Sequence, residues 1–324
     1  MPSSPKLKSL YLMKIMLEKT DAQNPLTVAE IISELNIYGI SAERKAIYND
    51  LDILREFGIE IETIKSKTVG YYVASRQFDL TELKLLVDAV QSSRFITLKK
   101  SQELIQKLSS LTSTALAKQL KRQIYVSGRA KSSNESALYN VDAIYAAIND
   151  GKKISFKYFD YDLRKNRVFR KNGSEYKATP IAMTWSDDKY YLIALCDEHR
   201  EIRHYRVDRM YTVTELDDVA DVTEPLDMAK YNKRVFGMYN GELVCADLCF
   251  DNSLVNIVLD QFGSDIFMIA SEGGYFNIKT DISISPVFLG WMFQLGRKAH
   301  INGPEKLITA MQKLIDENLE NYRL

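Results

Sequence analysis

One stretch, residues 41–58 (SAERKAIYNDLDILREFG), constrains the fold more than any other, because it reads as a single amphipathic helix. Ile47, Leu51 and Leu54 recur at helical spacing and therefore line one buried stripe. Ser41 is a favourable N-cap for such a helix. The side opposite the stripe is polar and gathers Ser41, Lys45, Tyr48, Asn49 and Asp52, flanked by Arg44 and Arg55. The stretch predicts a helix that packs on one side and presents charges and hydrogen-bonding groups on the other.

Two further helical patterns precede this stretch. Residues 7–19 repeat apolar side chains at helical spacing, and residues 27–38 begin at Thr27 with Glu30 three positions later, which is a capping box. A short turn through Gly39 joins the second helix to the third. The sequence therefore predicts a helix-turn-helix with the third helix in the recognition position.

A β-hairpin is expected directly after the third helix, which ends at Gly58. Residues 59–64 and 71–74 read as strands, and they flank the turn-like segment KSKTVG. Lys65 and Lys67 fall at the tip of this hairpin, which would form a wing beside the recognition helix.

At these residues the chain resembles the winged-helix domain of DeoR-type bacterial regulators, whose recognition helix reads S-x-x-R-x-T-I-x-R-D-L-x-x-L-x-x-x-G-I. The matching run is SAERKAIYNDLDILREFGI, with Ala46 in place of Thr and Asn49 in place of Arg. The resemblance implies that residues 1–75 bind DNA. The DNA-binding residues are then expected to be Ser41, Arg44, Lys45, Tyr48, Asn49, Lys65 and Lys67. The alternative is an ordinary helical subdomain whose polar face is solvated.

Composition favours a soluble protein of two or three domains. The chain has 324 residues, 46% of them hydrophobic, which is enough for packed cores. No apolar run approaches the roughly 20 residues of a membrane-spanning helix, and no signal peptide is evident. Cys196, Cys245 and Cys249 lie in apolar, strand-like runs, which suits buried reduced thiols. We therefore expect a cytoplasmic protein with no membrane partner and no metal site.

The formal net charge is zero, which argues against a general polyanion binder, but the charges are unevenly distributed. Residues 94–131 and 151–210 are rich in Lys and Arg, whereas residues 211–324 are acidic. Positive charge therefore concentrates in the middle of the chain.

Residues 76–136 read as a helical connector. Helical patterns cover residues 80–92 and 101–120, and the composition of residues 128–136 (GRAKSSNES) is typical of a linker. The connector either joins the DNA-binding part to a second module or pairs with the same helices of another copy. Its basic face is read as a solvated surface or as a source of phosphate contacts.

A short helix and a series of short strands follow from residue 139. The strands are separated by turn signals such as Lys171-Asn172-Gly173 and Ser186-Asp187-Asp188, which favours a small antiparallel β-barrel. Residues 201–217 read as one strand, in which alternation separates Arg203, Tyr205 and Arg209 from Arg206.

The run DDKYYLIALCDEHREIRHYRVDRMYTV resembles the signature of the WYL domain, an Sm-like small barrel named for Trp-Tyr-Leu and followed by R-x-x-R-x-D-R-I. The three named positions are Tyr190, Tyr191 and Leu192 here, and Met210 replaces the Ile. Arginines supply forked donors for phosphate or carboxylate, and neighbouring rings stack on bases. The candidate ligand-binding residues are Tyr190, Tyr191, Arg203, Tyr205, Arg206 and Arg209.

Two other roles compete for these side chains. Some of them could instead hold the barrel together, and Asp208 is expected to fix an arginine rather than to contact an anion. Because the two faces of a strand diverge, Arg203 and Arg209 are not expected to share a flat surface with Arg206.

Residues 223–324 predict a mixed region that ends in two helices separated by a short strand. Its L-G-W-x-x-x-L-G segment resembles the extension found after WYL domains. The expected fold class is multidomain α+β. Its predicted parts are a winged helix-turn-helix (1–75), a helical connector (76–136), an Sm-like small β-barrel or WYL domain (137–222) and a C-terminal α+β extension (223–324).

No enzyme motif is present: the sequence lacks a phosphate-binding P-loop, a dinucleotide fingerprint, H-E-x-x-H and G-x-S-x-G. His199, His204 and His300 do not have metal-ligand spacing. We therefore expect no catalytic activity and no cofactor.

The resemblances imply a transcriptional regulator that binds double-stranded operator DNA as a homodimer. Its WYL domain is expected to sense an anionic ligand, either a nucleotide or a single-stranded nucleic-acid effector. The alternative is an RNA- or single-strand-binding accessory protein of a defence or repair system. An enzyme acting on nucleotides is a third and more distant reading.

Overall fold

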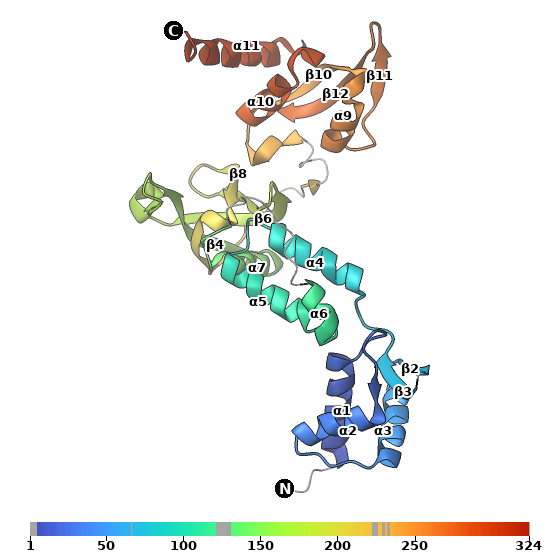
Figure 1. Cartoon of the computed structure of the whole chain (residues 1–324). Helices are drawn as coiled ribbons and strands as arrows, with labels where there is room; N and C mark the ends of the chain where they lie inside the picture. Colours follow the sequence, from blue (N-terminus) through green and yellow to red (C-terminus); the bar gives the residue numbers. More distant parts are fainter. Residues whose placement is uncertain are drawn as a thin grey trace. The chain divides into compact units, whose positions relative to one another are not determined.

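The computed structural model describes residues 5–65, 67–120, 131–221, 226–228, 231 and 234–323. The chain divides into two compact units, Met1–Glu135 and Ser136–Leu324. Figure 1 labels the helices and strands of each unit. Both units combine helices with antiparallel sheets, so the predicted multidomain α+β class is confirmed. Part of the predicted linker at residues 128–136, and the predicted boundary at residue 222, lie outside the described residues.

The first unit opens with three helices and a small sheet. The bounds are α1 Pro5–Lys19, β1 Leu26–Thr27, α2 Val28–Ile37, α3 Arg44–Glu56, β2 Ile61–Lys65 and β3 Val69–Val73. The predicted stripe of α3, formed by Ile47, Leu51 and Leu54, is buried in the core that the helices enclose. α1 and α2 complete this core with the side chains Leu12, Met16, Ile31 and Leu35. The apolar spacing therefore predicted the buried face of α3 correctly.

The start of α3 differs from the prediction, whereas the start of α2 agrees with it. Glu43 takes the N-cap position of α3 without a side-chain cap, and Ser41 precedes it outside the helix. The predicted Ser41 cap is wrong because the chain after Gly39 stays non-helical for several residues before Arg44. Thr27 and Glu30 form the predicted capping box: the Thr27 N–H donates to the Glu30 carboxylate at 2.7 Å, and the Glu30 N–H donates to the Thr27 hydroxyl.

The predicted hairpin follows α3. Gly58, at a φ of +105°, lies where the helix ends, and β2 pairs antiparallel with β3 so that Thr63 lies opposite Tyr71. β1 pairs with the other edge of β3, which gives the strand order β1-β3-β2. Gly70 permits this close packing, because a Cβ atom there would lie only 2.8 Å from the Cβ of Pro25.

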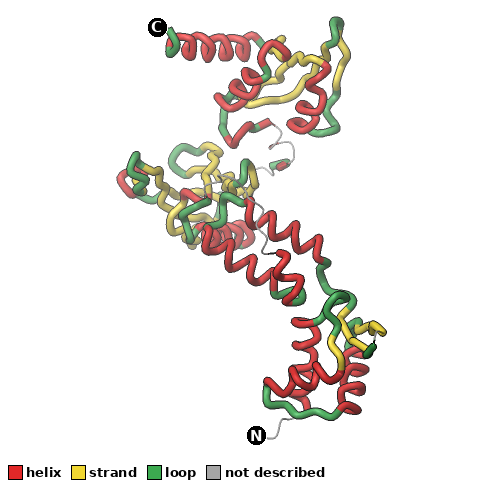
Figure 2. Tube along the Cα trace, in the orientation of Figure 1, coloured by secondary structure: helices red, strands yellow, loops and turns green. Residues whose placement is uncertain are grey.

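Three helices follow within the predicted connector: α4 Leu80–Ser92, α5 Leu98–Ser109 and α6 Thr114–Leu120. Figure 2 shows these segments as separate helical runs. Leu83, Val87 and Leu120 form their shared buried cluster. The apolar pattern of residues 101–120 is divided between α5 and α6, because the Ser113 hydroxyl accepts a hydrogen bond from the Leu116 N–H and begins a new helix.

The second unit begins with a helix and a curled antiparallel sheet. The bounds are α7 Ala137–Asn149, β4 Lys152–Tyr161, β5 Arg167–Phe169, β6 Tyr176–Ser186, β7 Lys189–Cys196, β8 Glu201–Arg206 and β9 Met210–Val219. The strand order is β5-β4-β6-β7-β8, and β9 also pairs with β4. The long strand β4 therefore has three partners, which curls the sheet around it.

The turn between β6 and β7 agrees with the prediction, but the strand after β7 does not. Asp187 and Asp188 both have positive φ values, 48° and 61°, as a tight two-residue hairpin turn requires. Residues 201–217, predicted as one strand, are interrupted by the 3-10 turn η2 Val207–Arg209. The prediction is wrong because β8 pairs with β7 whereas β9 pairs with β4, so the chain must change partner at this turn.

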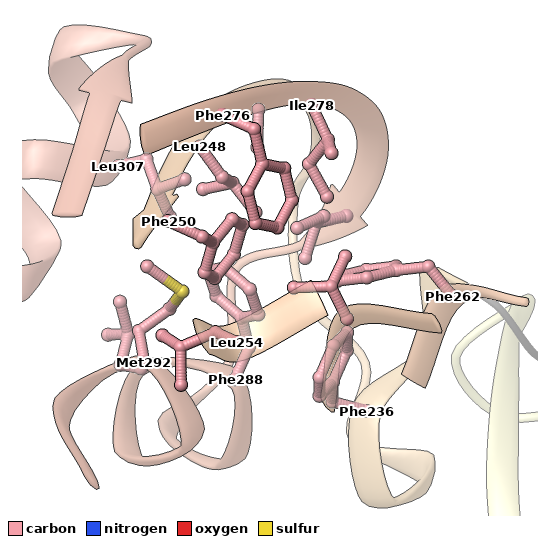
Figure 3. Close-up of a cluster of buried hydrophobic side chains, with 14 residues drawn as sticks. Phe236, Leu248, Phe250, Leu254, Phe262, Phe276, Ile278, Phe288, Met292 and Leu307 are labelled. Carbon is pink, nitrogen blue, oxygen red and sulfur yellow. The ribbon is translucent and has the colours of Figure 1, made fainter. Parts of the chain in front are cut away.

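The rest of the second unit packs helices on a second sheet. The bounds are β10 Leu243–Asp251, α9 Val255–Phe262, β11 Met268–Ser271, β12 Tyr275–Ser283, α10 Pro286–Gln294, β13 Ala299–Gly303 and α11 Glu305–Glu320. The sheet order is β11-β12-β10-β13. Figure 3 shows Phe250 and Phe276 of the sheet meeting Phe288 and Met292 of α10. The predicted ending, two helices separated by a short strand, is confirmed.

Two further expectations concern the whole chain. Within the described residues, no helix combines the length and apolar character needed to cross a bilayer. All three cysteines are free, and Cys196 and Cys249 are buried as expected. Cys245 is exposed, contrary to the expectation of a buried thiol, because alternate residues of β10 point away from the core.

Candidate functional site

The polar face of α3 is exposed in the first unit. Arg44, Lys45, Tyr48 and Asn49 all present their side chains to solvent, while Ile47 between them is buried. The Nε atom of Arg44 donates a hydrogen bond to the Tyr48 hydroxyl over 3.1 Å. The phenol therefore lies beside the guanidinium of Arg44 and restricts the directions in which its donors point.

The hairpin lies beside this face of α3. The rings of Tyr48 and Tyr71, the latter on β3, have centroids 6.3 Å apart. Lys65 and Lys67 are exposed at the tip of the hairpin, and Ser41 is exposed before the helix. All seven predicted DNA-contacting residues are thus accessible.

Two charged residues of α3 have internal partners. Asp50 is buried and lies 2.8 Å from the ammonium of Lys8 on α1. The Nε atom of Arg55 donates to the Ile61 carbonyl over 3.0 Å, and its Nη1 atom lies 2.6 Å from the Asp52 carboxylate. These contacts tie α3 to α1 and to β2.

The six predicted ligand-binding residues of the second unit lie on different surfaces of the sheet. In the register of β7 and β8, Tyr191 lies opposite Arg206, and Ala194 lies opposite Arg203. Paired residues share a face, and successive residues alternate between faces. Arg203 and Arg206 therefore point to opposite sides of β8, as the sequence predicted.

Tyr205 belongs to the core, so its predicted place among the ligand-binding residues is wrong. It is 5% exposed, and its ring lies 5.0 Å from that of Phe156, 5.7 Å from Tyr158 and 5.9 Å from Tyr176. Burial, together with the neighbouring Cys196 thiol, raises the pKa of the Tyr205 hydroxyl. The ring cannot stack on a ligand, because the inward face of β8 carries it into this aromatic cluster.

Arg206 is held by an internal carboxylate. Its Nε and Nη2 atoms donate to Asp208 over 3.1 and 2.7 Å, so the predicted role of Asp208 in fixing an arginine is confirmed. Burial lowers the pKa of Arg206, but the hydrogen bonds and charge of Asp208 outweigh it, and the pKa is raised overall. The backbone N–H of Arg206 also donates to the Tyr158 hydroxyl over 3.2 Å.

The remaining predicted residues have other neighbours. Tyr190 packs edge to face against Trp185, with ring centroids 4.6 Å apart. Arg209, in the turn η2, places its guanidinium carbon 4.5 Å from the ring centroid of Tyr161 on β4. Arg209 therefore contacts β4, whereas Arg206 lies opposite Tyr191 of β7.

A surface that the sequence reasoning missed surrounds Arg209. We name Tyr161, Arg167, Arg209 and Tyr211 the basic-aromatic surface. Arg167 lies over the ring of Phe159 at 4.8 Å, and Phe159 touches Tyr161 at 5.5 Å between centroids. Phe169 links this group to Tyr211. The sequence hints at this surface, because aromatic and basic residues are interleaved in KYFDY and RVFR. The surface forms only when β4 pairs with β5 and β9, and the sequence does not reveal that pairing.

The described residues hold no group of three or more His, Cys, Asp or Glu side chains that could bind a metal ion. His204 has a structural environment. Its Nε2 atom lies 2.8 Å from the Tyr231 hydroxyl, and burial lowers the pKa of its ring despite a backbone hydrogen bond with Met238. This histidine joins β8 to the segment that follows the curled sheet.

Comparisons with known proteins identify one domain. No curated protein matches the chain. The chain is similar to proteasome accessory factor B/C of Arthrobacter aurescens at 17% identity and a TM-score of 0.29, over 98% of this chain and 49% of that one. It therefore spans about half the length of that protein. It is also similar to a CRISPR Cas-related protein at 15% identity and a TM-score of 0.37, over 97% of this chain and 83% of that one. Residues 139–215 match the WYL domain family, so the chain contains a WYL domain that extends from α7 into β9.

Proposed function

We propose that this protein is a transcriptional regulator that binds operator DNA through α3 and the β2–β3 hairpin. The main observation behind this proposal is that α3 has one buried face and one exposed face rich in hydrogen-bond donors. Ile47 and Leu51 anchor the helix in its core, while Arg44, Lys45 and Asn49 remain available to a ligand.

The exposed groups suit duplex DNA. A major groove admits one α-helix, in which arginine pairs with guanine and asparagine with adenine through two hydrogen bonds each. Arg44 and Asn49 are the side chains of α3 that can make such contacts. Lys65 and Lys67 at the hairpin tip would neutralise phosphates, which positions the helix without reading sequence.

The WYL domain supplies the proposed effector site. Tyr161 and Tyr211 of the basic-aromatic surface are 37% and 41% exposed, and Arg209 and Arg167 lie beside them. Exposed rings stack on bases and arginines bind phosphates, so this surface suits a nucleotide or a single-stranded nucleic acid. Arg206 contributes less, because Asp208 occupies its forked donors. No catalytic step is part of the proposal.

Two copies are proposed to act together. One winged helix contacts a short half-site, and two linked copies bind two half-sites with a gain in affinity that depends on their geometry. Light scattering of the intact chain at micromolar concentration should therefore report a dimer. A monomer would remove this part of the proposal.

The test of DNA binding starts from duplexes selected out of a random pool with the intact chain. Arg44→Ala with Lys45→Ala should weaken binding to the selected duplex by about 10-fold or more, because it removes a base contact and a phosphate contact. Lys279→Ala with Lys313→Ala is the matched control, since it removes two positive charges from exposed positions of the second unit. Equal affinity of the two double variants would overturn the role of α3.

A second candidate function is binding of RNA or single strands as an accessory protein. The basic-aromatic surface favours it, because stacking on exposed tyrosines does not require a duplex. Binding of single strands without selection of any duplex would favour this function over operator recognition.

A further inference from the structure

A polar network with a buried centre joins residues 5–75 of the first unit, here called the reading part, to the connector helices α4–α6; Thr20, Asp21 and Ser113 are buried, Arg76 is half-buried and Thr114 is exposed. We name it the Asp21 junction; its members are Thr20, Asp21, Arg76, Ser113 and Thr114. Asp21 follows the end of α1 and is 5% exposed, and Ser113, at the start of α6, is fully buried. Their positions are 92 residues apart in the sequence, yet the Ser113 hydroxyl donates a hydrogen bond to the Asp21 carboxylate.

Asp21 is held from several directions. Its Oδ1 atom accepts hydrogen bonds from the Gln23 N–H at 2.9 Å, the Asn24 N–H at 3.0 Å and the Asn24 side-chain amide at 2.8 Å. Its Oδ2 atom is the acceptor for Ser113. The loop after α1 is therefore folded around the carboxylate, whose remaining oxygen is directed at the connector.

α6 is attached to the reading part by two adjacent hydroxyls. Ser113 both donates to Asp21 and accepts from the Leu116 N–H at 3.2 Å, so the start of the helix is fixed to the carboxylate. The Thr114 hydroxyl donates to the Glu18 carbonyl over 2.9 Å, which attaches α6 to the last turn of α1.

The covalent link between the two parts is fixed at the same place. Arg76 lies between β3 and α4, and its Nη2 atom donates to the Thr20 carbonyl over 2.6 Å. The Thr20 hydroxyl donates to the Met16 carbonyl at 2.6 Å and accepts from the Val73 N–H at 3.0 Å. Arg76, where the chain leaves the reading part, and Ser113, where α6 contacts it again, therefore both bond to the segment Thr20–Asp21.

A single covalent link allows one part to rotate about another, whereas attachment at two points removes that freedom. Directional hydrogen bonds also fix an angle, which an apolar contact of the same area would not.

We propose that the Asp21 junction fixes the orientation of the DNA-reading helix on the connector and thereby sets the half-site spacing that a pair of copies accepts. This inference rests on the proposed operator binding by two copies. Asp21 and Ser113 are positioning residues in this role, because neither lies on the exposed face of α3.

The geometry of DNA makes spacing a sensitive measure of this orientation. A helical turn contains about 10–10.5 base pairs over 34–36 Å, so each inserted pair moves a half-site by about 3.4 Å and rotates it by about 35°. Two rigidly held recognition helices can bind both half-sites at only a few spacer lengths. When the junction is loosened, the two helices can bind both half-sites at more spacer lengths, and the affinity for each single half-site is unchanged.

The experiment measures the affinity of the intact chain for a series of duplexes with the same selected half-sites and different spacers. Wild-type protein should prefer one spacer. Ser113→Ala should reduce the preference over the neighbouring spacers by about fivefold or more, a typical size for a coupling between sites. Ser113→Thr keeps the hydroxyl and should restore the preference. Ser110→Ala is the matched control, since Ser110 is exposed at the C-cap of α5 and its hydroxyl donates to the Lys107 carbonyl of that helix.

A duplex with a single half-site separates positioning from folding. Its affinity should be unchanged in Ser113→Ala, because the reading face is intact. Thr114→Val provides an independent loosening of α6, should Ser113→Ala not fold, and is expected to broaden the spacing preference in the same direction.

The outcomes are distinct. An unaltered spacing profile in folded Ser113→Ala or folded Thr114→Val overturns the inference, and so does loss of single half-site binding in the same variants. Failure of wild-type protein to bind any duplex would instead overturn the proposed function. A flattened spacing profile with retained half-site affinity supports the junction as the determinant of spacing.

Discussion

The guanidinium of Arg206 and the carboxylate of Asp208 form a forked pair across the end of β8, with donor-acceptor distances of 3.1 and 2.7 Å. The pair spans the point where the chain leaves β8 and enters the turn η2. It therefore stabilises the change of strand partner from β7 to β4. Arg206, which the sequence assigns to a ligand, thus has its Nε and Nη2 donors engaged within the fold.

Arg206→Ala is expected to destabilise the protein. It removes the two hydrogen bonds that Arg206 donates to the Asp208 carboxylate, whose side chain is 12% exposed, at a cost of about 1–3 kcal/mol in the free energy of unfolding. Urea denaturation of Arg206→Ala, Asp208→Ala and the double variant measures the pair in a thermodynamic cycle. The double variant should be little less stable than either single variant. Strict additivity would show that the two side chains act independently.

The basic-aromatic surface should carry single-strand binding. Tyr211→Ala is expected to weaken affinity for a short single-stranded oligonucleotide by about 1–3 kcal/mol, the contribution of one stacked base. Arg209→Ala should reduce the salt dependence of binding by about 0.7 in the logarithmic slope, as loss of one phosphate contact does. Fluorescence anisotropy at several salt concentrations measures both. Arg297→Ala, an exposed arginine of the second sheet region, is the control that should change neither quantity.

Tyr205→Phe should leave stability unchanged or raise it by up to about 1 kcal/mol. The Tyr205 hydroxyl is buried and makes no hydrogen bond of ordinary geometry with the described residues. Its removal therefore eliminates the energetic cost of burying an unsatisfied polar group. Tyr158→Phe is the contrasting variant, because the Tyr158 hydroxyl accepts from the Arg206 N–H and its loss should destabilise the protein. Thermal unfolding of both variants tests the assignment. Weaker oligonucleotide binding by Tyr205→Phe would return this residue to the ligand site.

The sequence predicted features whose partners are close along the chain. The stripe of Ile47, Leu51 and Leu54 needs only helical periodicity, and the Thr27–Glu30 capping box needs only a spacing of three. The Ser41 cap failed although it is local, because the same residue type also suits the non-helical segment that precedes α3.

The missed features depend on contacts between distant segments. Arg209 meets Tyr161 only because β9 pairs with β4, and Ser113 meets Asp21 only because α6 returns to the end of α1. The strand pattern of residues 201–217 does not reveal a change of pairing partner, so the buried Tyr205 could not be separated from the half-buried arginines beside it. Alternation specifies which residues share a face, but strand pairing decides which face is buried.

Leu51→Ala should destabilise the first unit by about 2–5 kcal/mol, because Leu51 is fully buried and its truncation leaves a cavity. Ile53→Ala is the matched control on the same helix. Ile53 is 45% exposed, and its truncation should change stability by only about 0.5 kcal/mol. Chemical denaturation followed by circular dichroism measures both variants. Equal effects would contradict the assignment of the buried face of α3.

Asp21 should make the stability of the first unit depend on acid pH. Burial raises the pKa of this carboxyl, but hydrogen bonds from Ser113, Asn24 and Gln23 outweigh burial and hold the pKa below the ordinary value of 3.8. Because the folded pKa is lower than the unfolded one, the ionised carboxylate stabilises the fold fully above about pH 3.8 and loses this effect as pH falls through the folded pKa.

Asp21→Asn removes the titrating group without changing the size of the side chain. The difference in unfolding free energy between wild type and Asp21→Asn should therefore be constant from neutral pH down to about 3.8 and should shrink below it. Urea denaturation across this pH range measures the difference. Ser110→Ala, which replaces an exposed hydroxyl and removes no titratable group, is the control expected to show a constant difference across the range. A difference for Asp21→Asn that stays constant below this range would show that the carboxylate does not depend on its hydrogen bonds to Ser113 and the loop after α1.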